Sequence, residues 1–177
     1  LREITGVGFK DCKLAIDETG GDVEKSIEFL RKKGIAKASN KMNRTAAEGL
    51  CLLHERNGEI SLIEINSETD FVAKNEVFIS FCKEVSILKY ESKADLSKNN
   101  KINMKNNLSV ETNLIDLIAK MGEKISIRRS IFFDNSNGKN SFYIHGAVDD
   151  KIGKSISIVK TSKESDIGKK VAMHVSA

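Results

Sequence analysis

The sequence predicts an α+β protein with a small helical unit, a linker, and a core of two duplicated antiparallel hairpin–helix lobes. Apolar residues recur at helical spacing in the first part of the chain. Strand-like runs then occur in pairs separated by short turns, and each pair is followed by a helical pattern. We therefore expect a helical domain at 1–34, a linker at 35–47, a first lobe at 48–130 and a second lobe at 131–177.

The helical domain is predicted to contain two short helices separated by Gly20-Gly21. Asp22 suits the N-cap of the second helix, because its carboxylate accepts a free backbone N–H. An apolar stripe follows at helical spacing: Val23, Ile27 and Leu30. Gly34 is expected to end this helix. Residues 35–47 carry several cations and little apolar periodicity, which predicts a linker that is helical in part.

The first lobe is predicted to begin with a hairpin. Residues 49–54 and 60–66 have strand character, and Asn57-Gly58 between them readily adopts the positive φ of a tight turn. Residues 76–89 follow as an amphipathic helix. Its apolar face consists of Val77, Phe78, Phe81, Cys82, Val85 and Leu88. The Ser-, Lys- and Asn-rich segment 92–108 predicts a surface loop.

A second helix and further strands complete the predicted core. The helix spans 110–121 and ends at Gly122, and a strand follows at 125–133. The second lobe then repeats the order of hairpin and helix, with one strand at 141–145 and another that begins at Ile156.

Two segments of similar sequence indicate an internal duplication. Residues 60–70 read Ile-Ser-Leu-Ile-Glu-Ile-Asn-Ser-Glu-Thr-Asp, and residues 156–166 read Ile-Ser-Ile-Val-Lys-Thr-Ser-Lys-Glu-Ser-Asp. The Ile, Ser, Glu and Asp residues coincide, and most of the remaining apolar positions differ conservatively. Because the order of the elements also agrees, we interpret the two segments as copies of one hairpin–helix unit.

The connection between the first hairpin and its helix carries an unusual pair, Asp70-Phe71. Two interpretations stay open. In the first, Asp70 caps the following helix and Phe71 packs back onto it. In the second, the aromatic ring enters another molecule. The second copy keeps the acid as Asp166 but has Ile167 in place of the aromatic, which favours a role for Phe71 beyond packing.

Composition excludes several functional classes. The net charge of +4 and the pI of about 8.9 are mildly basic, well short of a dedicated nucleic-acid binder. No apolar run is long enough to cross a membrane, and the first residues lack the apolar core of a signal peptide. Three separated cysteines, Cys12, Cys51 and Cys82, favour a reducing compartment and buried thiols.

No motif for catalysis or cofactor binding is present in the sequence. The three histidines, His54, His145 and His174, form no metal-ligand cluster. Neither a nucleophile elbow nor a phosphate-binding glycine loop occurs. The sequence therefore predicts a protein that is not an enzyme and that has no metal, no cofactor and no direct nucleotide site.

Five motifs, in order along the chain, resemble the elongation factor Ts family. Residues 69–75, Thr-Asp-Phe-Val-Ala-Lys-Asn, resemble the family signature, and residues 119–129, Ala-Lys-Met-Gly-Glu-Lys-Ile-Ser-Ile-Arg-Arg, resemble a second one. Residues 1–13 look like its ubiquitin-associated-type helical domain with the first helix cut short. Residues 143–146 and 172–175 match its second lobe. The missing start Met and the absence of the longer family members' final modules indicate a fragment.

The resemblance implies a cytoplasmic guanine-nucleotide exchange factor for elongation factor Tu, a GTPase, without a membrane or specific nucleic-acid partner. It implies that Phe71 wedges into that partner near its nucleotide and that Asp70 makes polar contacts there. The further implied contact residues are Thr69, Val72, Met121, Gly122, His145, Phe9 and Lys10. The family usually has two methionines where this chain has Phe9-Lys10, so this contact departs from the family pattern.

Two other functions compete with this reading. An RNA-associated module of the translation machinery would rest on the positive charge and on the Lys- and Asn-rich loop. A thiol-based activity would use Cys51 or Cys82.

Overall fold

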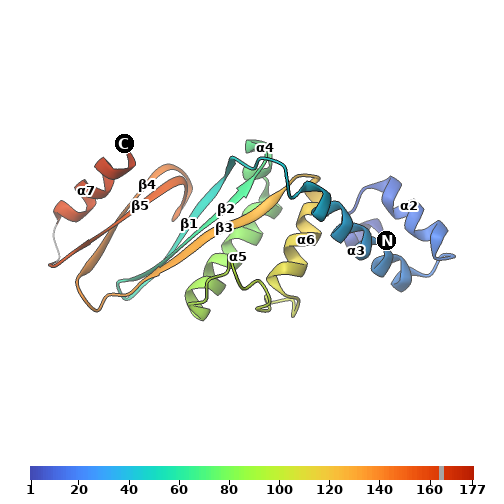
Figure 1. Cartoon of the computed structure of the whole chain (residues 1–177), viewed down its shortest axis with the longest axis horizontal. Helices are drawn as coiled ribbons and strands as arrows, with labels where there is room; N and C mark the ends of the chain where they lie inside the picture. The colour runs from blue at the N-terminus through green and yellow to red at the C-terminus, as the bar shows by residue number, and fades with distance from the viewer. Residues whose placement is uncertain (164–165) are drawn as a thin grey trace.

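The structure is a computed structural model and describes residues 1–163 and 166–177. Figure 1 shows an elongated molecule, with the helices of the first forty residues at one end and the C-terminal helix at the other. Between them lies one antiparallel five-stranded sheet, in the order β3-β2-β1-β5-β4. This confirms the predicted mixture of helices and antiparallel strands.

The described helices and strands have these bounds. The helices are α1 (Arg2–Thr5), α2 (Phe9–Glu18), α3 (Val23–Lys41), α4 (Asp70–Ala73), α5 (Glu76–Ser92), α6 (Val110–Met121) and α7 (Asp166–Ser176). The strands are β1 (Glu48–Arg56), β2 (Glu59–Ser67), β3 (Ile125–Phe133), β4 (Lys139–Asp149) and β5 (Ile152–Thr161).

The first hairpin follows the prediction closely. Strands β1 and β2 pair along their whole length, and the turn residues Asn57 and Gly58 have φ values of 54° and 78°. The second hairpin, β4–β5, joins the sheet through a short pairing in which Cys51 lies opposite Gly153. A Cβ atom at Gly153 would lie 2.4 Å from the Ile144 side chain, so a glycine is needed where the two hairpins meet.

Helices α5 and α6 cover one face of the sheet (Figure 1). Phe78, Cys82 and Val85 of α5 are fully buried there, as their spacing predicts. Val77 is 42% exposed, so its assignment to this face is wrong. The segment 92–108 is also more than a surface loop, because Leu96 and Met104 insert into the core.

Helix α3 differs from its prediction in length and in orientation. It continues to Lys41, so the expected helix end at Gly34 is wrong, and residues 35–41 are helical. The predicted stripe is right at Leu30, which is buried, and wrong at Val23 and Ile27, which are exposed. The buried row of α3 consists of Ser26, Leu30, Gly34 and Ala38. Ser26 and Leu30 face α2, whereas Gly34 faces Ala119 of α6 and is small because these two helices pack closely. Where the domain boundaries fall stays a prediction.

The order of hairpin and helix occurs twice, as β1-β2-α4-α5 and as β4-β5-α7. Glu164 and Ser165, which match Glu68 and Thr69 in the proposed duplication, lie outside the described residues. A common origin of the two units therefore stays a prediction. In the part of the chain that the structure describes, no helix combines the length and apolar character needed to span a membrane.

The position of Gly34 gives a test of the α3–α6 packing. A Cβ atom there would lie 3.5 Å from the Ala119 methyl group, which is an ordinary van der Waals contact. Gly34→Ala should therefore raise the free energy of unfolding by about 0.5–1 kcal/mol, because a helix-interior glycine loses more backbone entropy than alanine. Gly34→Leu should lower it, since the larger side chain forces the helices apart. Urea unfolding measures both, and a destabilised Gly34→Ala protein would contradict the room for a methyl group at position 34.

Candidate functional site

The Asp70-Phe71 pair lies on α4, a single helical turn that follows β2 directly. Val72 and Ala73 of this turn are buried against the main core. Phe71 is 82% exposed, the most exposed of the large hydrophobic side chains described. The ring of Phe71 therefore does not pack back onto the protein, so the first interpretation is wrong for this side chain, and its entry into another molecule stays a prediction.

Asp70 does not act as the predicted helix cap. It is the first residue of α4, and the cap of the longer helix α5 is Asn75, whose side chain accepts the Val77 N–H at 2.9 Å. The extra helical turn between strand and helix explains the difference. The Asp70 carboxylate instead accepts a 2.6 Å hydrogen bond from Lys74, and this bond lowers the pKa of Asp70.

A pair of crossed hydrogen bonds holds the base of this turn. The Glu123 carboxylate accepts the Thr69 N–H at 3.0 Å and the Thr69 hydroxyl at 2.6 Å. In the opposite direction, the Glu68 carboxylate accepts the Lys124 N–H at 2.5 Å. The consecutive residues Glu68 and Thr69 therefore bind the consecutive residues Lys124 and Glu123, which lie more than fifty positions further along the chain.

The same segment, residues 122–124, also binds the end of α3. The Lys124 ammonium group donates to the carbonyl oxygens of Met42 and Arg44 at 2.6 and 2.8 Å. Lys41 donates to the Gly122 carbonyl. The Arg44 guanidinium lies 3.4 Å from Glu68. The turn after α6 is thus a junction between the tip and the helical end of the molecule.

Nothing in the sequence pattern pointed to this junction. Glu68, Glu123 and Lys124 are ordinary charged residues next to the predicted site, and their pairing spans a long stretch of sequence. The one available signal was that Glu123 and Lys124 lie within the second segment that resembles a family signature, and that Glu68 directly precedes the first.

The other residues predicted to bind the partner lie on separate parts of the molecule. Met121 is half-buried at the end of α6, and Gly122 caps that helix with a φ of 76°. Phe9 is 68% exposed and lies with the exposed Lys10 at the start of α2. His145 is exposed on β4 in the second hairpin. Their roles, and those of the tip residues, stay predictions.

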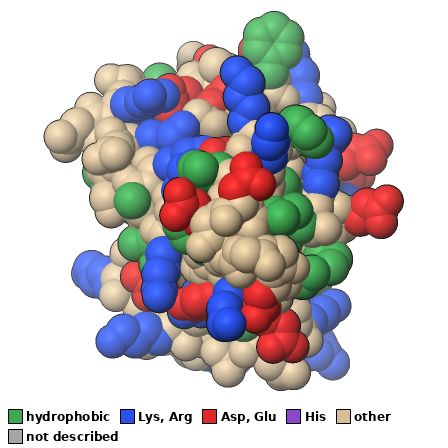
Figure 2. Space-filling model, turned by 90° about the vertical axis from the view of Figure 1, so that its right-hand side faces the viewer, with side chains coloured by type: hydrophobic (Ala, Val, Ile, Leu, Met, Phe, Trp, Pro, Cys, Tyr) green, Lys and Arg blue, Asp and Glu red, His purple; other side chains and the backbone are tan. Residues whose placement is uncertain are grey.

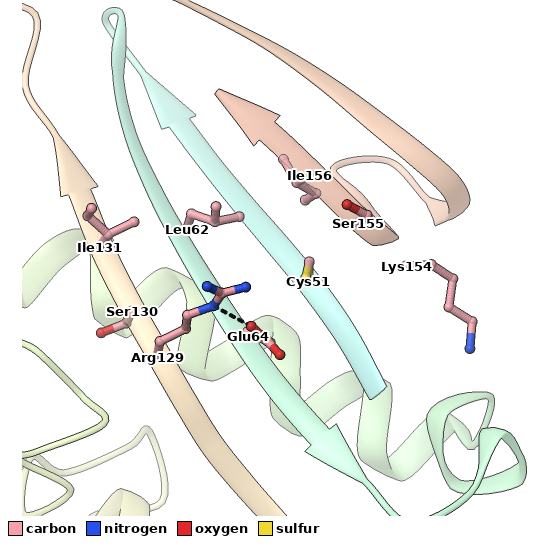
Figure 3. Close-up of a pocket in the computed structure, with 9 residues that line it drawn as sticks. All are labelled: Cys51, Leu62, Glu64, Arg129, Ser130, Ile131, Lys154, Ser155 and Ile156. Atoms are coloured by element: carbon pink, nitrogen blue, oxygen red, sulfur yellow. Dashed lines mark hydrogen bonds and ion pairs between the residues drawn. The ribbon is translucent and has the colours of Figure 1, made fainter. Parts of the chain in front are cut away.

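A cavity of about 450 Å³ lies on the sheet face opposite α5, where β5 diverges from β1 (Figure 3). Its wall includes Cys51 and Leu62, and Arg129 crosses it to bind Glu64. Burial alone would raise the pKa of Glu64, but the hydrogen bonds from Arg128 and Arg129 outweigh it and lower that pKa. The carboxylate is therefore held ionised between two guanidinium groups.

The cysteines are poorly suited to thiol chemistry. Cys12 and Cys82 are buried, and burial raises the pKa of the Cys82 thiol well above its ordinary value. Cys51, which is half-buried in the cavity wall, also has a raised pKa, first from burial and then from the nearby Glu64 carboxylate. Neutral thiols are weak nucleophiles, so the proposed thiol activity finds no support at either position.

The surface charges of the helical end are mixed. Figure 2 looks onto this end and shows Lys and Arg side chains interspersed with Asp, Glu and hydrophobic ones. A continuous basic patch, the electrostatic mark of a nucleic-acid surface, does not cover this face. Among residues 1–163 and 166–177, no three His, Cys, Asp or Glu side chains are grouped so as to hold a metal ion.

The fold and tip together define a mixed α/β protein that presents one aromatic side chain on a firmly anchored turn. A sequence model of the family described as Elongation factor TS matches residues 68–177, which include the tip, α6 and the second hairpin. The chain belongs to the elongation factor Ts family, as the resemblance of its motifs predicted.

Curated relatives match the whole chain. Elongation factor Ts of Methylorubrum extorquens (strain PA1) is 38% identical over 184 residues, covering 100% of this chain and 60% of the relative. The proteins of the same name from Maricaulis maris (strain MCS10) and Bradyrhizobium sp. (strain ORS 278) are 38% and 41% identical, and this chain again covers 59% of each. The chain thus spans about three-fifths of the length of these relatives.

The bond between Glu68 and Lys124 predicts a pH dependence of stability. The Lys124 N–H lowers the folded-state pKa of Glu68, so the bond is fully stabilising above the unfolded pKa, near 4.3, and is lost as the pH falls through the folded value. Glu68→Gln should therefore lower the free energy of unfolding by about 1 kcal/mol at pH 7, and by progressively less below pH 4. Urea unfolding at several pH values measures the difference.

The control for this test is Glu91→Gln, which removes one negative charge from an exposed position on α5. It should lower the free energy of unfolding at pH 7 by less than Glu68→Gln does, because the structure describes no protein hydrogen bond to the Glu91 side chain. A cost of Glu68→Gln that stays constant from pH 7 to pH 3 would contradict the assignment of Glu68 as the ionised acceptor.

Proposed function

We propose that this chain is the tip-bearing part of a guanine-nucleotide exchange factor that binds elongation factor Tu and promotes GDP release during translation elongation. Phe71 is the residue that enters the partner beside its nucleotide site, and Asp70 makes polar contacts at the same place. The protein acts in the cytoplasm, holds no nucleotide of its own, and performs no bond-breaking chemistry.

One observation carries this proposal. Phe71 is 82% exposed, although its neighbours Val72 and Ala73 are buried and hold the turn in place. Burying a phenylalanine side chain is worth about 1.5–3 kcal/mol, and the free protein forgoes most of this stabilisation at position 71. A partner pocket that receives the ring recovers it, and central aromatic residues of this kind dominate the energy of many interfaces.

Linkage explains how such a wedge releases a nucleotide. If the exchange factor and GDP cannot both bind the partner in one relaxed conformation, each weakens the other by the same factor. A buried aromatic hot spot contributes about 2–4 kcal/mol, which corresponds to roughly a 30- to 1,000-fold change in nucleotide affinity. Phe71 alone can therefore account for a large acceleration of GDP release.

The remaining predicted contacts take supporting roles in this proposal. Phe9 and Lys10 on α2 dock the helical end on the GTPase domain of the partner, and this second contact raises the local concentration of the tip. Met121 and Gly122 lie beside the junction that holds the tip and contact the same partner region. His145, on the second hairpin, contacts a different partner domain.

Replacing the aromatic ring tests the wedge directly. Phe71→Ala should leave the fold intact, because the ring has almost no packing to lose, and should slow GDP release from elongation factor Tu at least tenfold. Stopped-flow release of a fluorescent GDP measures the rate.

Val175→Ala is the matched control, since Val175 is 66% exposed on α7, an element separate from the tip. It should release GDP at the wild-type rate. A folded Phe71→Ala protein with wild-type rates would refute the wedge.

A second substitution separates docking from release. Phe9→Ala should raise the concentration of the chain needed for half-maximal GDP release by about three- to tenfold, because it removes one exposed anchor. The maximal rate at saturation should stay within about twofold of wild type, since the tip is unchanged. Titrations of the release rate against chain concentration resolve the two effects. A lower maximal rate with unchanged half-saturation would contradict a docking role.

A further inference from the structure

The helical turn that carries Phe71 is too short to fix its own position. Helix α4 has four residues, and the residue at its N-cap, Thr69, makes no side-chain cap bond to it. An isolated single turn is unstable, because forming it fixes several backbone angles for very few hydrogen bonds. The orientation of Phe71 must therefore come from contacts outside α4.

One such contact is the buried side of the turn. Val72 and Ala73 are buried against the main core, and this fixes the end of α4 that follows Phe71. The side chain of Ser67, which is fully buried, donates to the Thr69 carbonyl at 2.9 Å. These contacts resist a large displacement of the turn, but the residue that precedes Asp70 still needs a partner for its N–H and hydroxyl groups.

Glu123 provides that partner. Its two carboxylate oxygens accept one bond each from the Thr69 N–H and the Thr69 hydroxyl, at 3.0 and 2.6 Å. The first bond fixes the direction of the backbone where the chain leaves β2, and the second fixes the side-chain rotamer of Thr69. Hydrogen bonds to an ionised acceptor are short and about twice as strong as neutral ones.

The position of Glu123 is itself well defined. It lies between Gly122, whose carbonyl accepts a hydrogen bond from Lys41, and Lys124, whose N–H and ammonium groups are both bonded. The carboxylate thus rests on a turn held by α3 as well as by α6 and β3.

We propose that Glu123 is a positioning residue for Phe71. It holds Thr69 so that the ring projects outward at a fixed angle, and it acts through Thr69 without touching the partner. This inference deepens the proposed exchange function and rests on it for its effect on GDP release. Its structural part, that Glu123 restrains the tip, is independent of any partner.

Substitutions on both sides of the bond test the proposal. Thr69→Val removes the hydroxyl with little change in shape, and Glu123→Ala removes the acceptor. Each should lower the maximal rate of GDP release from elongation factor Tu about tenfold, the effect expected for a lost charge-assisted bond. Glu91→Ala, which removes an exposed carboxylate from α5, should stay within about twofold of wild type. Far-UV circular dichroism and thermal unfolding establish that each variant is folded.

A double substitution distinguishes positioning from general damage. In a Phe71→Ala background the ring is absent, so Glu123→Ala should lower the maximal rate by no more than about twofold further. A full additional tenfold loss would mean that Glu123 acts independently of Phe71, and it would overturn the proposal.

A measurement on the free chain separates this proposal from the proposed function. The sequence contains no Trp, so Phe71→Trp introduces a unique tryptophan at the tip, which can be excited selectively over the two tyrosines. Time-resolved anisotropy should show faster local motion of that side chain when Glu123→Ala or Thr69→Val is added. It should show no change when Thr69→Ser is added, because serine keeps the hydroxyl that donates to Glu123. Unchanged motion in both loosened variants would refute the positioning role. If the tip loosens as expected but the wild-type chain fails to release GDP, the exchange function is wrong and the positioning role stands.

Discussion

The turn at residues 122–124 is the constraint on which the arrangement of this molecule depends. Its backbone and side chains bind the base of the tip through Glu68 and Thr69, and they bind the end of α3 through Lys41 and the carbonyl groups that follow it. The turn also joins α6 to β3, so it belongs to both layers of the core. Three parts of the molecule that are distant in sequence thereby share one short segment. Most of these bonds have an ionised partner, and such bonds are stronger than neutral ones but sensitive to protonation and salt.

Around this junction, the residues that stabilise the fold are buried, whereas the residue proposed to bind a partner is exposed. The α5 and α6 side of the sheet is closed by fully buried aromatic and aliphatic side chains such as Phe78 and Val85. The tip contributes Val72 and Ala73 to that core and leaves Phe71 outside it. Removing the Phe71 ring should therefore change the free energy of unfolding little, whereas removing the side chain of either neighbour would open a cavity. A side chain that the fold does not need is available for a partner, and a partner contact can change without loss of the scaffold.

The sequence predicted those elements that local chemistry determines. Asn57-Gly58 gave the hairpin turn, and the apolar stripe between Ser109 and Gly122 gave α6 with its bounds. The failures have tertiary causes. Gly34 resembles a helix end, but it lies within α3 because a small residue is required against Ala119. Asp70 resembles a helix cap, but an additional turn moves that role to Asn75. The bond between Thr69 and Glu123 joins residues 54 positions apart, and no local pattern encodes such a pairing.

The second hairpin changes how the exposure of Phe71 is to be interpreted. In the proposed duplication, Asp166-Ile167-Gly168 stands where Asp70-Phe71-Val72 stands in the first unit. Ile167 is 65% exposed and Gly168 is buried, so both units have a buried residue directly after an exposed apolar one. An outward apolar residue at the start of the helix is thus a property that the two units share, and exposure alone does not single out position 71. What distinguishes the first unit is the aromatic ring at that position and the buried Ala73 that anchors the turn two residues later. The choice of residue and its fixed support, more than exposure as such, therefore favour a dedicated partner contact at Phe71.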